Sequence, residues 1–218
     1  MVKKLVVLIS GRGSNLLALL NAIEAGSLHA EIVAVISNRS EAPGLEFARS
    51  RHIPSIVVPS KNRSRADFEA ELSAAIEQYS PDWIILAGFM RILGSDTVDR
   101  FEGRMFNIHP SLLPKYTGLN THERVLAAGD QEHGASVHIV TAELDGGPVI
   151  GQVKVSVFPD DTVETLSQRV LAQEHTLYVQ TMEMCVQENI SMKQNCCYVD
   201  GKAVSLPLLT LDNRAIET

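Results

Sequence analysis

The chain has 218 residues, of which 45% are hydrophobic and 21% are charged. This composition is typical of a soluble globular protein, and the length suits a single domain. The formal net charge of −7 argues against a nucleic-acid-binding surface, which usually presents a basic face, although local groups can still hold a small anionic ligand.

Cysteine usage and the shortness of the apolar runs indicate the cellular compartment of the protein. The three cysteines, Cys185, Cys196 and Cys197, lack a C-x-x-C spacing, which predicts reduced thiols in the cytosol rather than a disulfide framework. The apolar run Leu5–Ile9 is too short for a signal peptide, and no run approaches the ~20 residues that span a membrane. We therefore expect a cytoplasmic protein with no membrane partner.

Short apolar runs alternate with helical patterns from the N-terminus to about residue 128. The runs that predict strands are Lys4–Ile9, Glu31–Ile36, Ser55–Val58, Trp83–Leu86 and Met105–Ile108. The segments with helical spacing are Asn15–Ala25, Pro43–Arg51, Arg65–Tyr79 and Ser95–Phe101. Alternating strands and helices imply right-handed crossovers, so the pattern predicts an α/β fold with a mostly parallel sheet covered by helices on both faces.

The pattern changes after Thr121–Ala128. Ala135–Thr141 and Val149–Phe158 resemble strands joined by a glycine-rich turn, which predicts an antiparallel extension at one sheet edge. Asp161–Glu188 then has the pattern of one long helix. We expect residues 1–190 to form one domain.

The last thirty residues carry weaker signals. Asp200-Gly201 predicts a hairpin turn, and the chain from Pro207 onwards has the character of a loose tail. We expect residues 191–218 to form a hairpin and tail packed on the same domain.

The segment Ser10–Asn15 lies between the first predicted strand and the first predicted helix. Its glycines allow backbone N–H groups to approach an anion closely, and the helix N-terminus adds partial positive charge. The match to the dinucleotide fingerprint is imperfect, because Leu16 replaces the third glycine; the alternative is a tight turn with an Asn or Ser cap. The position at the carboxyl end of a strand favours a phosphate-binding loop, and the imperfect fingerprint disfavours NAD.

The segment Ala87–Gly94 follows the fourth predicted strand, at the same edge of the sheet. A loop that exposes Phe89, Met90, Ile92 and Leu93 is unusual unless it lines an apolar slot. A satellite hydrophobic cluster explains the composition equally well. Arg91 could meet a carboxylate or a ring.

Asn107 and His109 form the most informative pair. They are two residues apart on a predicted strand, so an amide and an imidazole project from the same face, and Pro110 ends that strand. Asp145, in its glycine-rich turn, offers a carboxylate that could orient the imidazole. Each of these residues taken singly is more often structural, but together they favour acyl transfer. His133 and His138 lack metal-binding spacing, so we expect no metal.

These motifs resemble the phosphoribosylglycinamide formyltransferases (glycinamide ribonucleotide transformylases), the folate-dependent enzymes of purine synthesis. The resemblance runs from about residue 4 to residue 190. It is carried by the phosphate loop and by Ala87–Leu93, Asn107–Pro114, Thr121-His122, Ser136–His138 and Leu144–Pro148. It implies a Rossmann-like, open, mostly parallel twisted sheet of about seven strands, with helices on both faces and an antiparallel C-terminal edge.

The resemblance also implies the roles of individual residues. Asn107, His109 and Asp145 would be catalytic. The residues implied for glycinamide ribonucleotide are Gly13, Ser14, Asn15, Gln173 and Glu174. The residues implied for the co-substrate 10-formyltetrahydrofolate are Arg65, Met90, Arg91, Ile92, Leu93, Asn107, Val140, Thr141, Ala142, Glu143, Leu144 and Asp145.

Three other functions remain open at this point. Hydrolysis of the same folate needs the same trio, but that family usually carries an N-terminal regulatory domain. Formyl transfer to initiator tRNA calls for a C-terminal domain and a basic surface. A non-catalytic phosphometabolite-binding module explains the glycine loop and leaves the trio unexplained. The expected partners are small molecules, without nucleic acid or membrane, and the expected state is a monomer or weak homodimer.

Overall fold

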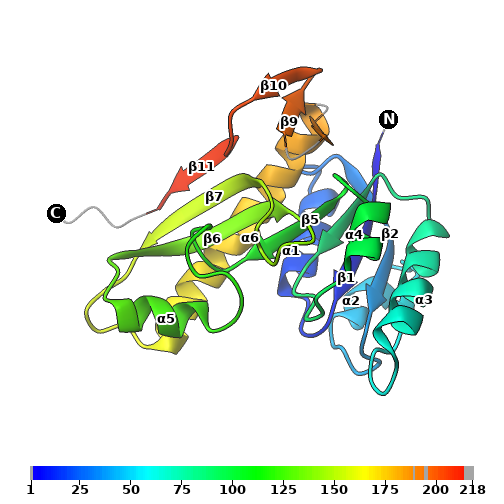
Figure 1. Cartoon of the computed structure of the whole chain (residues 1–218), viewed down its shortest axis with the longest axis horizontal. Helices are drawn as coiled ribbons and strands as arrows, with labels where there is room; N and C mark the ends of the chain where they lie inside the picture. The colour runs from blue at the N-terminus through cyan, green and yellow to red at the C-terminus, as the bar shows by residue number, and fades with distance from the viewer. Residues whose placement is uncertain (1, 189, 194–195, 214–218) are drawn as a thin grey trace. The chain divides into compact units, whose positions relative to one another are not determined.

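The structure is a computed structural model that describes residues 2–188, 190–193 and 196–213 (Figure 1). The chain divides into two compact units, residues 1–107 and residues 108–218. Each unit has its own strands and helices.

The first unit is built on five parallel strands. In chain order they are β1 (Lys3–Ile9), β2 (Ala30–Ser37), β3 (Ser55–Val57), β4 (Trp83–Leu86) and β5 (Met105–His109), whose last two residues already belong to the second unit. Their order across the sheet is β5-β4-β1-β2-β3. Leu5–Ile9 are fully buried, as expected for a central strand that is covered on both faces.

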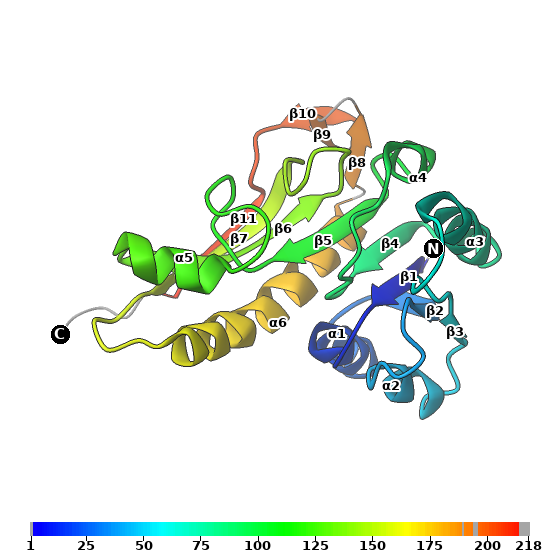
Figure 2. The same cartoon turned by 60° about the horizontal axis from the view of Figure 1, so that its bottom comes forward.

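Four helices connect these strands: α1 (Ser14–Glu24), α2 (Leu45–Arg49), α3 (Arg65–Glu77) and α4 (Ser95–Arg100). The chain moves outward from β1 to β3 and then returns to β4 and β5 on the other side of β1. Right-handed crossovers therefore place α1 and α2 on one face and α3 and α4 on the other, as Figure 2 shows. The direction reverses between β1 and β4, and ligands of open α/β sheets bind at the carboxyl ends of such a strand pair.

The second unit contains the antiparallel pair β6 (Glu132–Ile139) and β7 (Val149–Ser156). A further strand, β11 (Leu209–Asp212), runs parallel to β7. The long helix α6 (Val163–Gln187) packs against β6 and β7, and the shorter helix α5 (Thr121–Ala128) contacts α6. A capping box between Thr162 and Thr165 begins α6.

A separate antiparallel sheet of three strands lies near the C-terminus. Its strands are β8 (Ile190–Lys193), β9 (Cys196–Val199) and β10 (Lys202–Val204), in the order β10-β9-β8. Asp200 and Gly201 connect β9 to β10 with φ angles of 47° and 77°. Two successive positive φ angles are those of a type I′ turn, so the predicted hairpin is confirmed.

The predicted fold class is confirmed: the sheet is mixed, mostly parallel and flanked by helices. It has eight strands rather than about seven, because the expectation of a loose tail from Pro207 onwards is wrong for the described residues; residues 214–218 lie outside them. Leu209 and Leu211 alternate with polar residues and form β11, which pairs with β7 from Gly151 onwards. The expected antiparallel pair is present, but the strand beyond it, at the edge, is the parallel β11. The single domain over residues 1–190, with residues 191–218 packed on it, stays a prediction.

None of the helices among the described residues is long and apolar enough to cross a membrane. Cys185, Cys196 and Cys197 are free thiols.

Candidate active site

The glycine loop of the first unit ends at the start of α1. Gly13 is the N-cap residue and has a φ of 74°, in the left-handed region that favours glycine. A Cβ atom there would lie 2.9 Å from the Cα atom of Gly44, so the loop also requires glycine for close backbone approach. No side chain caps α1, so the alternative of a Ser- or Asn-capped turn is not the one observed. Ser14 is half-buried and Asn15 is 7% exposed.

Ser10 joins this loop to the segment that follows β4. Its hydroxyl accepts a hydrogen bond from the Met90 N–H at 2.8 Å and donates one to the Asn38 carboxamide oxygen at 2.6 Å. The Ser10 N–H donates to the Gly88 carbonyl at 3.1 Å. Two loops that are 80 residues apart in sequence therefore begin in direct contact, at the carboxyl ends of β1 and β4.

The segment after β4 exposes fewer apolar side chains than expected. Met90 and Ile92 are 60% and 65% exposed, whereas Phe89 and Leu93 are buried. The expectation that all four are exposed is thus wrong, because Phe89 and Leu93, at the two ends of the exposed run 90–92, turn inward. The guanidinium of Arg91 lies over the Phe68 ring, 5.7 Å from its centroid.

Arg65, the first residue of α3, reaches the same segment. Its Nη2 donates to the Ile92 carbonyl at 3.1 Å, and its Nε donates to the Glu69 carboxylate at 2.7 Å. The Arg65 side chain is 54% exposed. The structure therefore places Arg65 against the backbone of the Met90–Leu93 segment, with which the sequence had grouped it.

His109 and Asp145 lie together in the second unit. His109 Nδ1 is 3.5 Å from Asp145 Oδ2, and both side chains are more than nine-tenths buried. The Gly118 N–H donates to the same carboxylate oxygen at 2.8 Å. His109 Nε2 lies 2.9 Å from the Tyr116 carbonyl oxygen, which can only accept, so Nε2 carries a proton. Asp145 itself has a φ of 51°, a left-handed conformation that Asp tolerates better than most residues.

The sequence analysis did not select His138, which contacts the other oxygen of this carboxylate. His138 Nε2 lies 3.6 Å from Asp145 Oδ1, and its Nδ1 donates to the Ile139 carbonyl at 2.9 Å. Burial lowers the pKa of His138, against the opposing effects of the Ile139 hydrogen bond and of Asp145. The period-two pattern places Ser136 and His138 on one face of their strand, but the approach of the 140–148 connection to that face is a tertiary contact.

Asn107 is the last residue of the first unit and lies on the same strand as His109, two residues before it. It is half-buried, between the buried Phe106 and Ile108, as the alternation of β5 requires. The amide and the imidazole leave the same face of β5.

The remaining predicted site residues lie on the 140–147 connection and on α6. Val140 and Thr141 are half-buried, and Ala142, Glu143 and Leu144 are exposed. Glu174 is 8% exposed within α6. Gln173, beside it, accepts a hydrogen bond from the side chain of Asn213, just beyond β11. That contact ties one predicted substrate residue to the C-terminal strand.

Two further histidines form a pair. His122 Nδ1 and His133 Nε2 are 2.9 Å apart. Burial, with the neighbouring imidazoles, lowers the pKa of His133 to about 4, so at least this ring is neutral at neutral pH. Within the described ranges, no group of three or more His, Cys, Asp or Glu side chains is placed to hold a metal ion.

Comparison with known proteins decides the family. The family model described as “Formyl transferase” matches residues 3–182. The chain belongs to the formyl transferase family. The phosphoribosylglycinamide formyltransferase of Escherichia coli strain K12 is 46% identical over 199 residues, which make up 91% of this chain and 94% of that enzyme.

Solved structures agree with this assignment to the formyl transferases. The phosphoribosylglycinamide formyltransferase of Coxiella burnetii is 49% identical and has a TM-score of 0.90, covering 97% of this chain and 100% of that one. A formyltetrahydrofolate deformylase of Pseudomonas syringae pv. tomato has a TM-score of 0.85 at 26% identity, and it aligns over 91% of this chain and 66% of its own.

The geometry of this formyl transferase suits acyl chemistry at His109. The ring lies between two groups that can only accept hydrogen bonds, the Asp145 carboxylate and the Tyr116 carbonyl. The carbonyl contact requires a proton on Nε2, and an N–H donor of this kind can stabilise a developing oxyanion. The hydrogen bond from Nε2 to the Tyr116 carbonyl must break before Nε2 can donate to a substrate.

Proposed function

We propose that this chain transfers the formyl group of 10-formyltetrahydrofolate to the amine of glycinamide ribonucleotide, a step of purine synthesis. The observation that carries the proposal is the 46% identity to the Escherichia coli phosphoribosylglycinamide formyltransferase over nearly the whole of both chains. The buried contact between His109 and Asp145 supports it, because the carboxylate can orient an imidazole donor of the kind that acyl transfer needs.

The proposed mechanism is direct attack of the substrate amine on the formyl carbon. The new C–N bond forms as the carbonyl π electrons move to oxygen, and the Asn107 carboxamide and the His109 imidazolium stabilise the resulting oxyanion. Asp145 orients the imidazolium. A water ordered by Asp145 carries the proton from the attacking nitrogen to the leaving folate nitrogen as the old C–N bond breaks.

Two sets of residues bind the substrates in this proposal. Gly13, Ser14 and Asn15 hold the phosphate of glycinamide ribonucleotide at the N-terminus of α1, and Gln173 and Glu174 hold its amine end. The folate is bound by Arg65, by Met90–Leu93 and by Val140–Asp145. The exposed Met90 and Ile92 provide apolar surface for the flat pterin, and Arg65 provides charge for the carboxylates of the benzoylglutamate. We place this activity in the cytoplasm, in a monomer or weak homodimer that needs no metal.

Hydrolysis of the same folate is the second candidate function. It is favoured by the TM-score of 0.85 to the Pseudomonas syringae deformylase, because water would then take the place of the amine at the same trio. Identity to that deformylase is 26%, against 49% to the Coxiella burnetii transferase, which favours transfer.

One experiment separates the two candidates. Deformylation of 10-formyltetrahydrofolate is followed by absorbance with and without glycinamide ribonucleotide. We expect turnover that depends on the amine and gives formylated ribonucleotide. Equal turnover without the amine would establish hydrolysis. No deformylation with or without the amine would indicate a non-catalytic binding module.

A further inference from the structure

Glu69 of α3 is a buried carboxylate that accepts three hydrogen bonds, one from its own helix and two from residues after β4. Its Oε1 accepts from Arg65 Nε at 2.7 Å and from the Gly94 N–H at 2.9 Å. Its Oε2 accepts from the Thr97 hydroxyl at 2.8 Å. The residue is 8% exposed. Glu69 thus ties the first turn of α3 to the end of the Met90–Gly94 segment and to α4.

The charge of Glu69 is part of this arrangement. Burial by itself would raise the pKa of the Glu69 carboxyl, but the hydrogen bonds from Arg65, Thr97 and Gly94 outweigh burial and hold the pKa below its ordinary value. The group is therefore a carboxylate at neutral pH. Its contact with the loop is also close: a Cβ atom on Gly94 would lie 2.9 Å from Glu69 Oε2.

Arg65 is fixed at two points by this arrangement. Glu69 holds its Nε, and the Ile92 carbonyl holds its Nη2. An arginine side chain has several rotatable bonds, so a free one loses about 2 kcal/mol of conformational entropy when it binds. Among the described residues Nη1 has no hydrogen-bond partner, and the side chain is 54% exposed. The guanidinium is thus already oriented, with an outer edge that remains available to an anion.

We propose that Glu69 is a positioning residue, which sets the Arg65 guanidinium and the Met90–Gly94 segment to receive the carboxylate-bearing tail of the folate. The inference rests on the proposed function, since it takes Arg65 as the residue that meets those carboxylates. Glu69 touches no reacting atom and acts through Arg65 and the Gly94 N–H.

The first test replaces Glu69 by its neutral isostere. In Glu69→Gln the amide oxygen can still accept from Gly94, and the Thr97 hydroxyl can turn to accept from the amide, so the shape stays and the charge is lost. The amide oxygen also still accepts from Arg65 Nε, but as a neutral acceptor. We expect the KM for 10-formyltetrahydrofolate to rise about 5- to 30-fold, the range that corresponds to replacing a charge-assisted hydrogen bond by a neutral one. The kcat and the KM for glycinamide ribonucleotide should stay within about twofold.

Glu77→Gln is the matched control. Glu77 lies on the same helix and pairs with Arg100 of α4 at 2.6 Å, so it too joins α3 to α4, but its side chain is 45% exposed. It should leave both KM values unchanged. If Glu69→Gln and Glu77→Gln have the same effects, or if Glu69→Gln raises both KM values together, Glu69 only supports the fold and the inference is wrong.

The second test is a double-mutant cycle between Glu69→Gln and Arg65→Ala. If Glu69 acts through Arg65, its effect on the folate KM should largely disappear in the Arg65→Ala background. The effect should also shrink with a folate analogue that lacks the glutamate moiety. Additive effects, or an undiminished effect with that analogue, would overturn the inference.

Failure of the proposed function can be told apart from failure of this inference. Binding of tetrahydrofolate to the unmodified chain and to each variant is measured by calorimetry, which needs no turnover. A chain without amine-dependent activity refutes the proposed function alone. Equal tetrahydrofolate affinities for the unmodified chain and Glu69→Gln refute the positioning role, whatever the activity.

Discussion

His109 Nδ1 lies 3.5 Å from Asp145 Oδ2, and the opposite nitrogen of the same ring donates to the Tyr116 carbonyl at 2.9 Å. The buried ring is thus placed between two groups that only accept hydrogen bonds. In the proposed mechanism the ring donates to the developing oxyanion from this buried position, where a hydrogen bond to a charge is stronger than in water because the surroundings screen it less.

His109→Ala and Asp145→Asn should therefore each lower kcat by about 10²–10⁴-fold with little loss of fold. The first change removes the donor, and the second removes the carboxylate that orients the ring. The measurement is amine-dependent deformylation, with circular dichroism to check folding. His29→Ala, an exposed histidine of the other unit, should behave like the unmodified chain. Near-normal turnover in both active-site variants would show that His109 and Asp145 do not have these roles.

The sequence predicted most of the regular structure because hydrophobic period and local breakers set it. The first strand was expected over Lys4–Ile9 and begins one residue earlier, and the long helix was expected over Asp161–Glu188 and runs from Val163 after the Thr162 cap. β11 was missed. Its two leucines alternate with polar residues, but the strand is only four residues long. A strand this short forms because it pairs with the edge of β7.

The contacts of the site likewise divide into those that local sequence patterns predict and those that depend on tertiary structure. The strand period alone places Asn107 and His109 on one face, and a spacing of four residues on α3 allows Arg65 to meet Glu69. The approach of His138 to Asp145, and that of Gly94 and Thr97 to Glu69, depend on how connections fold back over the sheet. No local pattern in the sequence encodes those contacts.

Ser10→Ala should weaken the binding of both substrates. The change leaves the part-buried Met90 N–H without the hydroxyl that accepts from it, and it leaves the buried Asn38 carboxamide oxygen without its donor. A buried polar group left unsatisfied costs about 1–3 kcal/mol, so we expect both the glycine loop and the Met90 segment to loosen. Steady-state kinetics should give a higher KM for each substrate and a smaller change in kcat.

Ser27→Ala is the control for that change. The Ser27 hydroxyl also bonds to backbone, at 3.1 Å from the Ala22 carbonyl, but it lies beyond the opposite end of α1. It should leave both KM values as they are. A rise in the folate KM alone for Ser10→Ala would mean that Ser10 does not couple the two loops.

Ser14→Ala combined with Asn15→Ala should chiefly raise the KM for the phosphorylated substrate. The N-cap residue of α1 is Gly13, so the double change leaves that cap intact, and circular dichroism checks that the helix is retained. Steady-state kinetics with glycinamide ribonucleotide varied at saturating folate gives this KM directly. An unchanged value would remove the argument for a phosphate loop at the start of α1.

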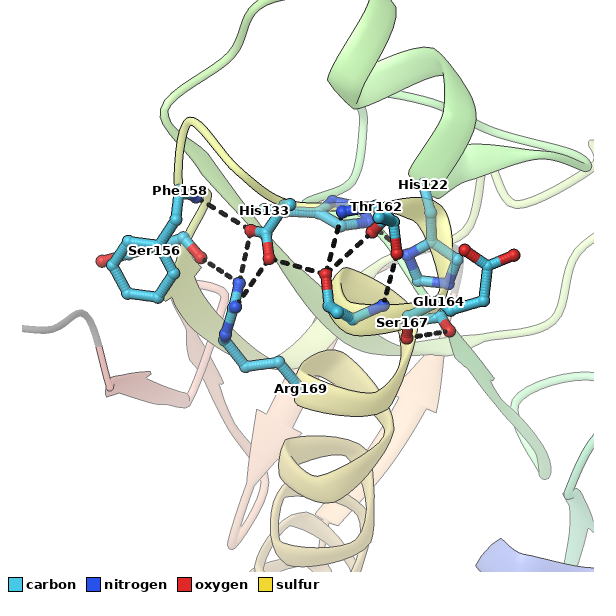
Figure 3. A network of polar contacts seen from close by, with 10 residues as sticks. His122, His133, Ser156, Phe158, Thr162, Glu164, Ser167 and Arg169 are labelled. Atoms are coloured by element: carbon cyan, nitrogen blue, oxygen red, sulfur yellow. Dashed lines mark hydrogen bonds and ion pairs between the residues drawn. The ribbon is translucent and has the colours of Figure 1, made fainter.

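A different carboxylate fixes the start of the helix that carries Glu174. Asp161 accepts two hydrogen bonds from Arg169, each at 2.7 Å, one from the Phe158 N–H at 2.8 Å and one from the Thr165 hydroxyl at 2.9 Å. Figure 3 shows Arg169 reaching from the first turns of α6 toward Ser156 and Phe158. These bonds, led by those from Arg169, lower the pKa of Asp161 to about 2.

Asp161 should therefore contribute stability that acid removes. Its carboxyl has a pKa near 3.9 in the unfolded chain and about 2 in the folded one, so the folded state binds the proton more weakly. The contribution is complete above about pH 4 and is lost as the pH falls to about 2. Asp161→Asn should lower the free energy of unfolding by about 1–2 kcal/mol near neutral pH and by much less near pH 2, measured by urea unfolding followed by circular dichroism. Asp160→Asn, at the exposed neighbouring residue, is the control and should show no such pH-dependent difference from the unmodified chain. If Asp161→Asn lowers the free energy of unfolding equally at both pH values, the charge of Asp161 is not what stabilises the start of α6.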